Sequence, residues 1–127
     1  SLVAGEAVAA MMLEADANGH YSAPVTVNGV TMRGLIDTGA TAISMSVATA
    51  QKMGIAYQNG RRAQMVTANG NTSGYAVVLN SVTVGSITLS QVQAVVSESE
   101  TPLLIGSSFL NRVSVSIDGK RMTLTKR

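Results

Sequence analysis

The stretch that decides the fold is "LIDTGATAIS", residues 35–44, in which one acidic side chain follows two large apolar ones. Leu35 and Ile36 indicate the end of a buried strand, and Thr38-Gly39 indicates a tight turn after it. A carboxylate this close to a core is costly unless it is paired, because an isolated buried charge loses its hydration. Asp37 is therefore either a turn residue that accepts backbone N–H groups or a carboxylate held for chemistry.

The segments around this stretch predict strands and hairpins. Runs rich in Val, Ile, Thr and Leu show partial two-residue alternation, and Asn-Gly or Asp-Gly pairs, which favour two-residue type I′ turns, separate them. Ser46 can cap a short helix that Gly54 ends, and another helical turn can follow Gly106. The predicted strands cover residues 11–13, 22–36, 75–96, 113–118 and 121–127, and the predicted turns are Asn18-Gly19, Asn28-Gly29, Asn59-Gly60, Asn69-Gly70 and Asp118-Gly119. This pattern predicts an all-β, barrel-like domain with one or two short helices.

Composition argues against several classes of function. The 127 residues include nine basic and seven acidic side chains, three Tyr, one Phe and no Trp. The basic and acidic side chains nearly balance, and few aromatic rings are available to stack on bases. Both features argue against nucleic-acid binding. The chain has no cysteine, which excludes a disulfide and a thiolate metal site. His20 is the only histidine and the acidic residues are scattered, so we expect no metal site and no histidine-dependent triad.

The length fits one domain. We predict a single domain over residues 13–127, preceded by an N-terminal segment, residues 1–12, whose structure the pattern does not define. No run reaches the roughly 18–20 apolar residues that a membrane span needs, and no leader pattern follows Ser1. A signal or membrane anchor upstream of Ser1 is compatible with this sequence.

Four segments together resemble one family. "LIDTGATAISMS", the helix "VATAQKMGI", the hairpin "MVTANGNTSGY" and "TPLLIGSSFLNRVSVSIDGKRMTL" are similar, in this order and spacing, to the retroviral-type (retropepsin-like) aspartic proteases. The resemblance is strongest to their bacterial, often membrane-anchored periplasmic branch, and it runs from Leu13 to the C-terminus. It implies a closed β-barrel that holds half an active site per chain. It also implies an aspartic endopeptidase without a cofactor, acting on polypeptides as a homodimer, in the bacterial periplasm or anchored to a membrane facing it.

The resemblance also assigns roles to residues. Asp37 would be the catalytic carboxylate, Thr38 would brace the dimer axis, Gly39 would leave room at the paired carboxylates, and Ala40 would lie beside them. Ala68, Asn69, Gly70 and Asn71 would form a flap over the substrate, and Leu104, Ile105 and Gly106 would pack behind the Asp37 loop.

The sequence departs from the viral pattern after Gly106. Ser107-Ser108 stand where the viral enzymes have an Arg-Asn pair that helps to bind the dimer together. Asn111 and Arg112 could compensate from the short helix, or the terminal strands could be arranged differently.

One chain contains a single Asp-Thr-Gly. None of the other acidic residues stands in such a context, so a second carboxylate has to come from a second chain related by two-fold symmetry. These other residues are Glu6, Glu14, Asp16, Glu98, Glu100 and Asp118. The alternative to an enzyme is a peptide-binding or dimerisation module that keeps the protease fold without catalysis.

Overall fold

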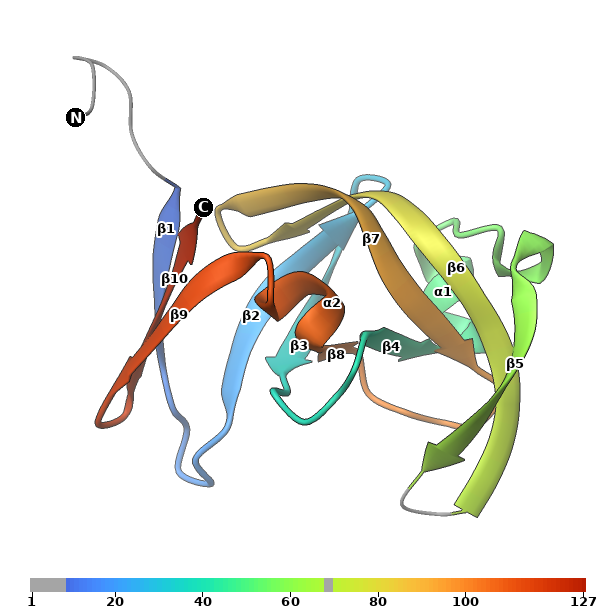
Figure 1. Cartoon of the computed structure of the whole chain (residues 1–127), viewed down its shortest axis with the longest axis horizontal. Helices are drawn as coiled ribbons and strands as arrows, with labels where there is room; N and C mark the ends of the chain where they lie inside the picture. The colour runs from blue at the N-terminus through green and yellow to red at the C-terminus, as the bar shows by residue number, and fades with distance from the viewer. Residues whose placement is uncertain (1–8, 68–69) are drawn as a thin grey trace.

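The computed structural model describes residues 9–67 and 70–127, and strands make up most of them (Figure 1). The chain order of the elements is β1 (Ala10–Glu14), β2 (Tyr21–Val27), β3 (Val30–Ile36), β4 (Ile43–Ser46), α1 (Val47–Lys52), the 3₁₀ helix η1 (Tyr57–Asn59), β5 (Arg61–Thr67), β6 (Gly70–Val84), β7 (Ile87–Ser97), β8 (Leu104–Ile105), α2 (Ser107–Leu110), β9 (Val113–Asp118) and β10 (Arg121–Lys126). None of the helices in these two ranges has the length and apolar character to cross a membrane.

Six of the strands close into a barrel. They pair in the order β2-β3-β8-β4-β7-β6, and β6 pairs back with β2 at Val84↔Val25 and Thr83↔Thr26. β5 lies outside this ring and pairs with the first half of β6, so that the two strands form the long hairpin at the right of Figure 1. The expected all-β closed barrel with short helices is confirmed.

The hydrophobic core lies within this one chain. Its largest fully buried side chains include Phe109 of α2, Met45 of β4, Ile105 of β8 and Val92 of β7. Burial of side chains of this size stabilises a fold by about 1.5–3 kcal/mol each. The core therefore needs no second chain to be complete.

The predicted hairpin at Asn28-Gly29 is correct. Val27 pairs with Val30, which leaves these two residues as the loop, and their φ angles of 52° and 78° are the left-handed values that a type I′ turn requires. Asn28 Nδ2 also donates to the carbonyl of Met53 at 2.9 Å, which ties the turn to the end of α1.

Three other predicted turns differ from expectation. Asn59-Gly60 is not a hairpin turn, because Asn59 ends η1 and Gly60 leads into β5. At the β9–β10 hairpin, Asp118 itself pairs with Arg121, so the loop is Gly119-Lys120. Asn18-Gly19 does form a turn, but it joins β1 and β2, which pair with β10 and β3 respectively rather than with each other.

Both predicted helices are present. The Ser46 hydroxyl accepts the backbone N–H of Thr49 at 3.2 Å and so caps α1, which ends before Gly54, a residue with a φ of 66°. Gly106 precedes α2 as expected. These short helices cover turns of the barrel and add Ala50 and Phe109 to its core.

A separate three-stranded sheet lies beside the barrel, in the order β1-β10-β9 (left in Figure 1). Met122 and Leu124 of β10 belong to the same core as the barrel. β1 begins at Ala10, ahead of the predicted domain start at residue 13. β9 is an edge strand whose last five residues are exposed, including Val115 at 40% and Ile117 at 57%. The outer backbone groups of β9 have no strand partner among the described residues.

Candidate active site

Asp37 begins the turn that follows β3. Its backbone N–H donates to the carbonyl of Ile105 at 2.9 Å, and its carbonyl accepts the N–H of Ala40 at 3.2 Å. The backbone N–H of Gly39 donates to the Asp37 carboxylate oxygen Oδ1 at 2.9 Å. The side chain is thus only partly buried and held by its own turn, so its position is fixed by the backbone while the rest of the carboxylate stays accessible.

β8 lies directly alongside this turn. Leu104 and Ile105 pair in parallel register with Leu35 and Ile36, so β8 continues the sheet on which Asp37 is mounted. At Gly106 the chain passes so close to the turn that an added Cβ would lie 2.5 Å from the carbonyl oxygens of both Ala40 and Ala42. Only glycine fits there without movement of the Asp37 loop.

A hollow of about 880 Å³ opens above Asp37, and we call it the central cleft. Its floor includes Asp37, Gly39 and Ala40, and one side is formed by Ala63 to Val66 of β5. The other side is formed by Ser97, at the end of β7, and by residues 99–102 of the connection from β7 to β8. Among the described residues, Asp37 and Glu100 are the only charged side chains that line it. The rest of the lining mixes apolar side chains such as Met65 and Leu104 with uncharged polar ones such as Gln64 and Thr101, and a cleft of this size and character can hold a segment of polypeptide.

A family model described as gag-polyprotein putative aspartyl protease matches residues 23–112, a range that holds the Asp37 turn, the β5–β6 hairpin and β8. The chain belongs to this family. The expected retropepsin-like relationship is confirmed by a crystal structure of a retropepsin-like aspartic protease from Rickettsia conorii. That structure matches with a TM-score of 0.81 and 27% identity, over 94% of this chain and 92% of the other.

Two curated relatives match at the level of sequence. An uncharacterized protein from the cobV 5′ region of a Sinorhizobium species is 31% identical over 108 residues, which are 83% of this chain and 46% of that protein. An uncharacterized protein of Rickettsia prowazekii is 30% identical over 80 residues, which are 62% of this chain and 35% of that protein. The chain therefore spans less than half of the length of the curated relatives that it matches.

Of the residues predicted for the Asp37 loop and for the segment behind it, some line the central cleft and others do not. Asp37, Gly39, Ala40 and Leu104 line the central cleft together. Thr38 is exposed and forms no hydrogen bond within residues 9–67 and 70–127. Residues 9–67 and 70–127 contain no group of three or more His, Cys, Asp or Glu side chains that could hold a metal ion.

The predicted flap corresponds to the β5–β6 hairpin. Register pairs Thr67 with Gly70 and Val66 with Asn71, and the exposed Val66 and the partly buried Met65 line the central cleft. Ala68 and Asn69 lie outside the described residues. That this hairpin covers a bound peptide and moves to do so stays a prediction.

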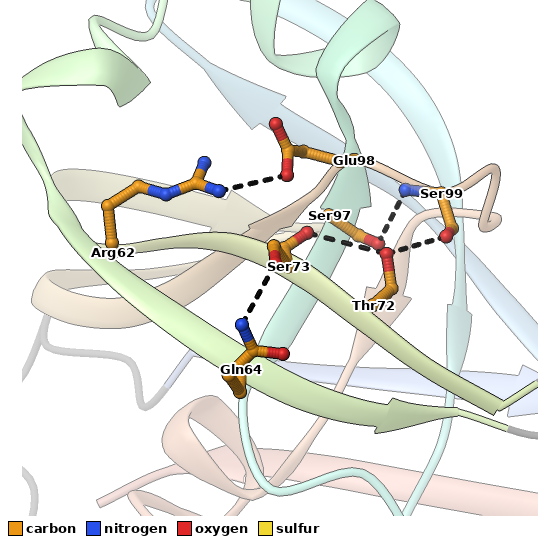
Figure 2. A network of polar contacts seen from close by, with 7 residues as sticks. All are labelled: Arg62, Gln64, Thr72, Ser73, Ser97, Glu98 and Ser99. Carbon is orange, nitrogen blue, oxygen red and sulfur yellow. Dashed lines mark hydrogen bonds and ion pairs between the residues drawn. The ribbon is translucent and has the colours of Figure 1, made fainter.

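Polar contacts join the stem of this hairpin to the far wall of the cleft, as Figure 2 shows. The hydroxyls of Thr72 and Ser99 lie 2.7 Å apart, and the N–H of Glu98 donates to the carbonyl of Ser73 at 3.0 Å. Gln64 Nε2 donates to the Ser73 hydroxyl at 3.1 Å on the other side of the hairpin. The two walls of the cleft are therefore linked within one chain.

Arg62 extends this link. Its guanidinium lies 3.1 Å from the Glu98 carboxylate and 4.6 Å from the ring centre of Tyr75, which in turn contacts the ring of Tyr57 edge-on at 5.2 Å. The hydrogen bond with Glu98 raises the pKa of the Arg62 guanidinium above its usual value. Both charged side chains are about half exposed, so the ion pair adds little to the free energy of unfolding. Its main effect is to hold the Arg62 side chain in place.

Sequence reasoning missed Ser108. Its hydroxyl accepts the backbone N–H of Ile43 at 3.0 Å and donates to the carbonyl of Gln93 at 2.7 Å, while its own N–H donates to the carbonyl of Thr41 at 3.1 Å. Ser108 thus ties the end of the Asp37 loop to β7. One member of the predicted compensating pair, Arg112, donates to the carbonyls of Ser90 and Gln91 of its own chain.

Ser108→Ala is expected to remove both hydroxyl bonds and to leave the Ile43 N–H without its partner. Loss of a partner for a largely buried backbone group costs about 1–3 kcal/mol, so the midpoint of thermal unfolding should fall by several degrees. Ser107→Ala is the matched control, because Ser107 contributes its backbone N–H to Ala40 rather than its hydroxyl. Equal melting temperatures of the two variants would show that the Ser108 hydroxyl does not support the loop.

Proposed function

We propose that this chain is an aspartic endopeptidase in which Asp37 and Asp37 of a second copy together activate a water molecule against a peptide bond. The observation that carries the proposal is the Asp37 carboxylate, fixed by the Gly39 N–H at the floor of a peptide-sized cleft in a chain of the aspartyl protease family. Two adjacent carboxylates cannot both ionise freely, so one takes the proton from water while the other keeps its proton and polarises the carbonyl.

The second carboxylate is proposed to come from another copy of the chain. Glu100, the other acid in the central cleft, is exposed and lies in the connection between β7 and β8 without a turn like that of Asp37. A two-fold axis beside the exposed Thr38-Gly39 would bring two Asp37 side chains together and give each Thr38 hydroxyl a partner.

The edge of β9 supports this arrangement. β9 follows α2, and the first two residues of α2, Ser107 and Ser108, are hydrogen-bonded to the Asp37 loop. An exposed edge strand with apolar side chains such as Val115 and Ile117 is a natural surface for antiparallel pairing with its own copy. Pairing β9 with its symmetry mate would build one continuous sheet from both copies.

The experiment that tests the function is hydrolysis of an unfolded protein, measured over a range of chain concentrations. Specific activity should rise with concentration until the dimer saturates, because one chain holds one carboxylate. Specific activity that stays constant far below the measured dimer dissociation constant would contradict a shared site. Peptide binding without any cleavage would favour the non-catalytic module instead.

Ile117→Lys is expected to weaken the dimer at least tenfold, because it places a charge in the proposed β9 pairing. Sedimentation equilibrium measures the dissociation constant, and activity at low concentration should fall in parallel. Met12→Lys is the matched control, since Met12 is 63% exposed on the opposite edge strand of the same sheet. If both variants dissociate equally, or neither does, β9 is not the specific interface.

A further inference from the structure

A second hollow of about 700 Å³ adjoins the central cleft, and we call it the distal hollow. The two hollows are neighbours, because Thr41, Ala42 and Val95 line both of them. The remaining wall of the distal hollow comes from residues at both ends of η1, the start of β5 and parts of β6 and β7. These residues are Ala56, Asn59, Gly60, Arg61, Ala76, Val77, Val78, Gln93 and Ala94.

Within the part of the chain that the structure describes, Arg61 is the only charged side chain that lines the distal hollow. It is exposed, and its guanidinium forms no hydrogen bond or ion pair with the described residues. The next residue differs, because the guanidinium of Arg62 pairs with Glu98 (Figure 2) and also lies over the Tyr75 ring. Arg61 is therefore a cation that is available to a ligand, above a wall that is otherwise small, apolar or uncharged.

The central cleft has the opposite charge. Its charged side chains are the carboxylates of Asp37 and Glu100, and no Lys, Arg or His of residues 9–67 and 70–127 lines it. Glu100 is exposed and, within those ranges, forms no ion pair, unlike Glu98 nearby. An acidic side chain bound beside Asp37 would meet like charge, whereas an acidic side chain bound at Arg61 would meet its complement.

We propose that the distal hollow is a substrate subsite in which Arg61 selects an acidic side chain of the bound polypeptide. The inference rests on the proposed peptide-cleaving function and adds the substrate class, namely peptides that are apolar at the scissile bond and acidic some residues away.

The length of β5 sets the distance between the peptide residue bound at Arg61 and the scissile bond beside Asp37. Arg61 lines the distal hollow and Ala63 to Val66 line the central cleft, so one strand runs past both. Strands rise about 3.3 Å per residue, and an extended peptide beside β5 advances at the same rate. The acidic residue is thus expected about two to five residues from the scissile bond, the separation of Arg61 from Ala63 and from Val66 along β5. In a symmetric dimer a distal hollow lies at each end of the joined cleft.

Cleavage profiling of a peptide library with the natural protein tests this. We expect Asp and Glu to be enriched at a position two to five residues from the cut and depleted directly next to it. At the enriched position, Glu should exceed Gln about two- to fivefold in kcat/KM, the range of an exposed ion pair. Arg61→Gln should remove this preference, and Arg61→Glu should turn it into a preference for Lys.

Lys52→Gln is the matched control, because it removes the same charge from α1, outside both hollows. It should leave the profile unchanged. Added salt should reduce the Glu preference of the natural protein, because the pair is exposed to solvent. An unchanged profile in Arg61→Gln, or an equal change in Lys52→Gln, would overturn the assignment of Arg61.

Binding measurements separate this inference from the proposed function. Fluorescence anisotropy with labelled peptides on Asp37→Asn reports affinity without any cleavage. If the natural protein cuts nothing but Asp37→Asn prefers the Glu peptide through Arg61, the proposed function fails and the subsite stands. If the natural protein cuts peptides with no preference at those positions, the subsite fails and the function stands. A chain that neither cuts nor binds these peptides refutes both.

Discussion

Asp37→Asn is expected to abolish the proposed peptide hydrolysis and to leave the barrel and the proposed dimer intact, which is the largest functional effect that we expect. The amide oxygen of the substituted side chain can still accept the Gly39 N–H that holds the turn, so the loop should keep its shape. An amide can neither take a proton from water nor share one with a second carboxylate. Loss of acid–base catalysis by one group costs about 10²- to 10⁴-fold, and here both copies lose it, so the variant should show no measurable turnover.

The control for this prediction is Glu100→Gln, which neutralises the other carboxylate of the central cleft. It should retain turnover and change only which peptides are preferred. Circular dichroism and sedimentation of Asp37→Asn are needed beside the kinetics, because a lost fold or dimer would also stop hydrolysis. A folded, dimeric Asp37→Asn with substantial residual activity shows that another group activates the water.

Gly106→Ala should have the largest effect on stability. Its φ of −105° is ordinary for any residue, so the reason is contact and not conformation. The new methyl group would lie 2.5 Å from the carbonyl oxygens of Ala40 and Ala42, which are backbone atoms that cannot rotate away. Overpacking of this kind costs about 1–3 kcal/mol and occasionally more, which lowers the melting temperature by roughly 4–15 °C.

Gly39→Ala is the matched control in the same loop. There an added Cβ would meet only the Asp37 carboxylate oxygen, at 3.3 Å, among the described residues. Thermal unfolding of the two variants should therefore differ by several degrees, with Gly106→Ala the less stable. If Gly106→Ala melts like the natural protein, the approach of β8 to the Asp37 loop is not tightly packed.

Local chemistry predicted the parts of the fold that depend on a few neighbouring residues. The Asn28-Gly29 turn and the Ser46 cap needed only their own backbone, and both were correct. Asn59-Gly60 failed because a turn motif does not specify what precedes it, and here the Tyr57 ring packs on Tyr75, which is distant along the chain. A local motif can also place a hairpin loop one residue away from its true position. The predicted loop Asp118-Gly119 is in fact Gly119-Lys120, because Asp118 pairs with Arg121.

The loop at Gly85-Ser86 shows the same limit. Val84 pairs with Ile87, so a glycine with a φ of 59° turns the chain inside residues 75–96, a run of predicted strand for which no turn was predicted. Gly-Ser is a weaker signal than Asn-Gly, but it suits a two-residue hairpin whose first central residue needs positive φ.

The candidate site also contains some residues that local motifs predict and others that only the folded chain brings together. Asp37 and the β8 segment could be found because they are defined by sequence motifs. Ser108 and Ser99 could not be found, since their significance comes from hydrogen bonds between segments far apart in the chain. Arg61 could not be found either, since the hollow that it lines is built from distant segments. Ser108 contacts residues 65 and 15 positions away. The sequence showed that Ser107-Ser108 stand where the viral enzymes have an Arg-Asn pair. It did not show that the Ser108 hydroxyl would bond to Ile43 and Gln93.

The completeness of the core within one chain has a kinetic consequence. Folding is then a first-order process for each chain, and assembly of the proposed active dimer is a separate second-order process. Where chains are dilute compared with the dimer dissociation constant, the amount of active species grows with the square of their number. Doubling the local concentration would quadruple the rate of hydrolysis, so anything that gathers folded chains in a small volume acts as an activator without touching the cleft.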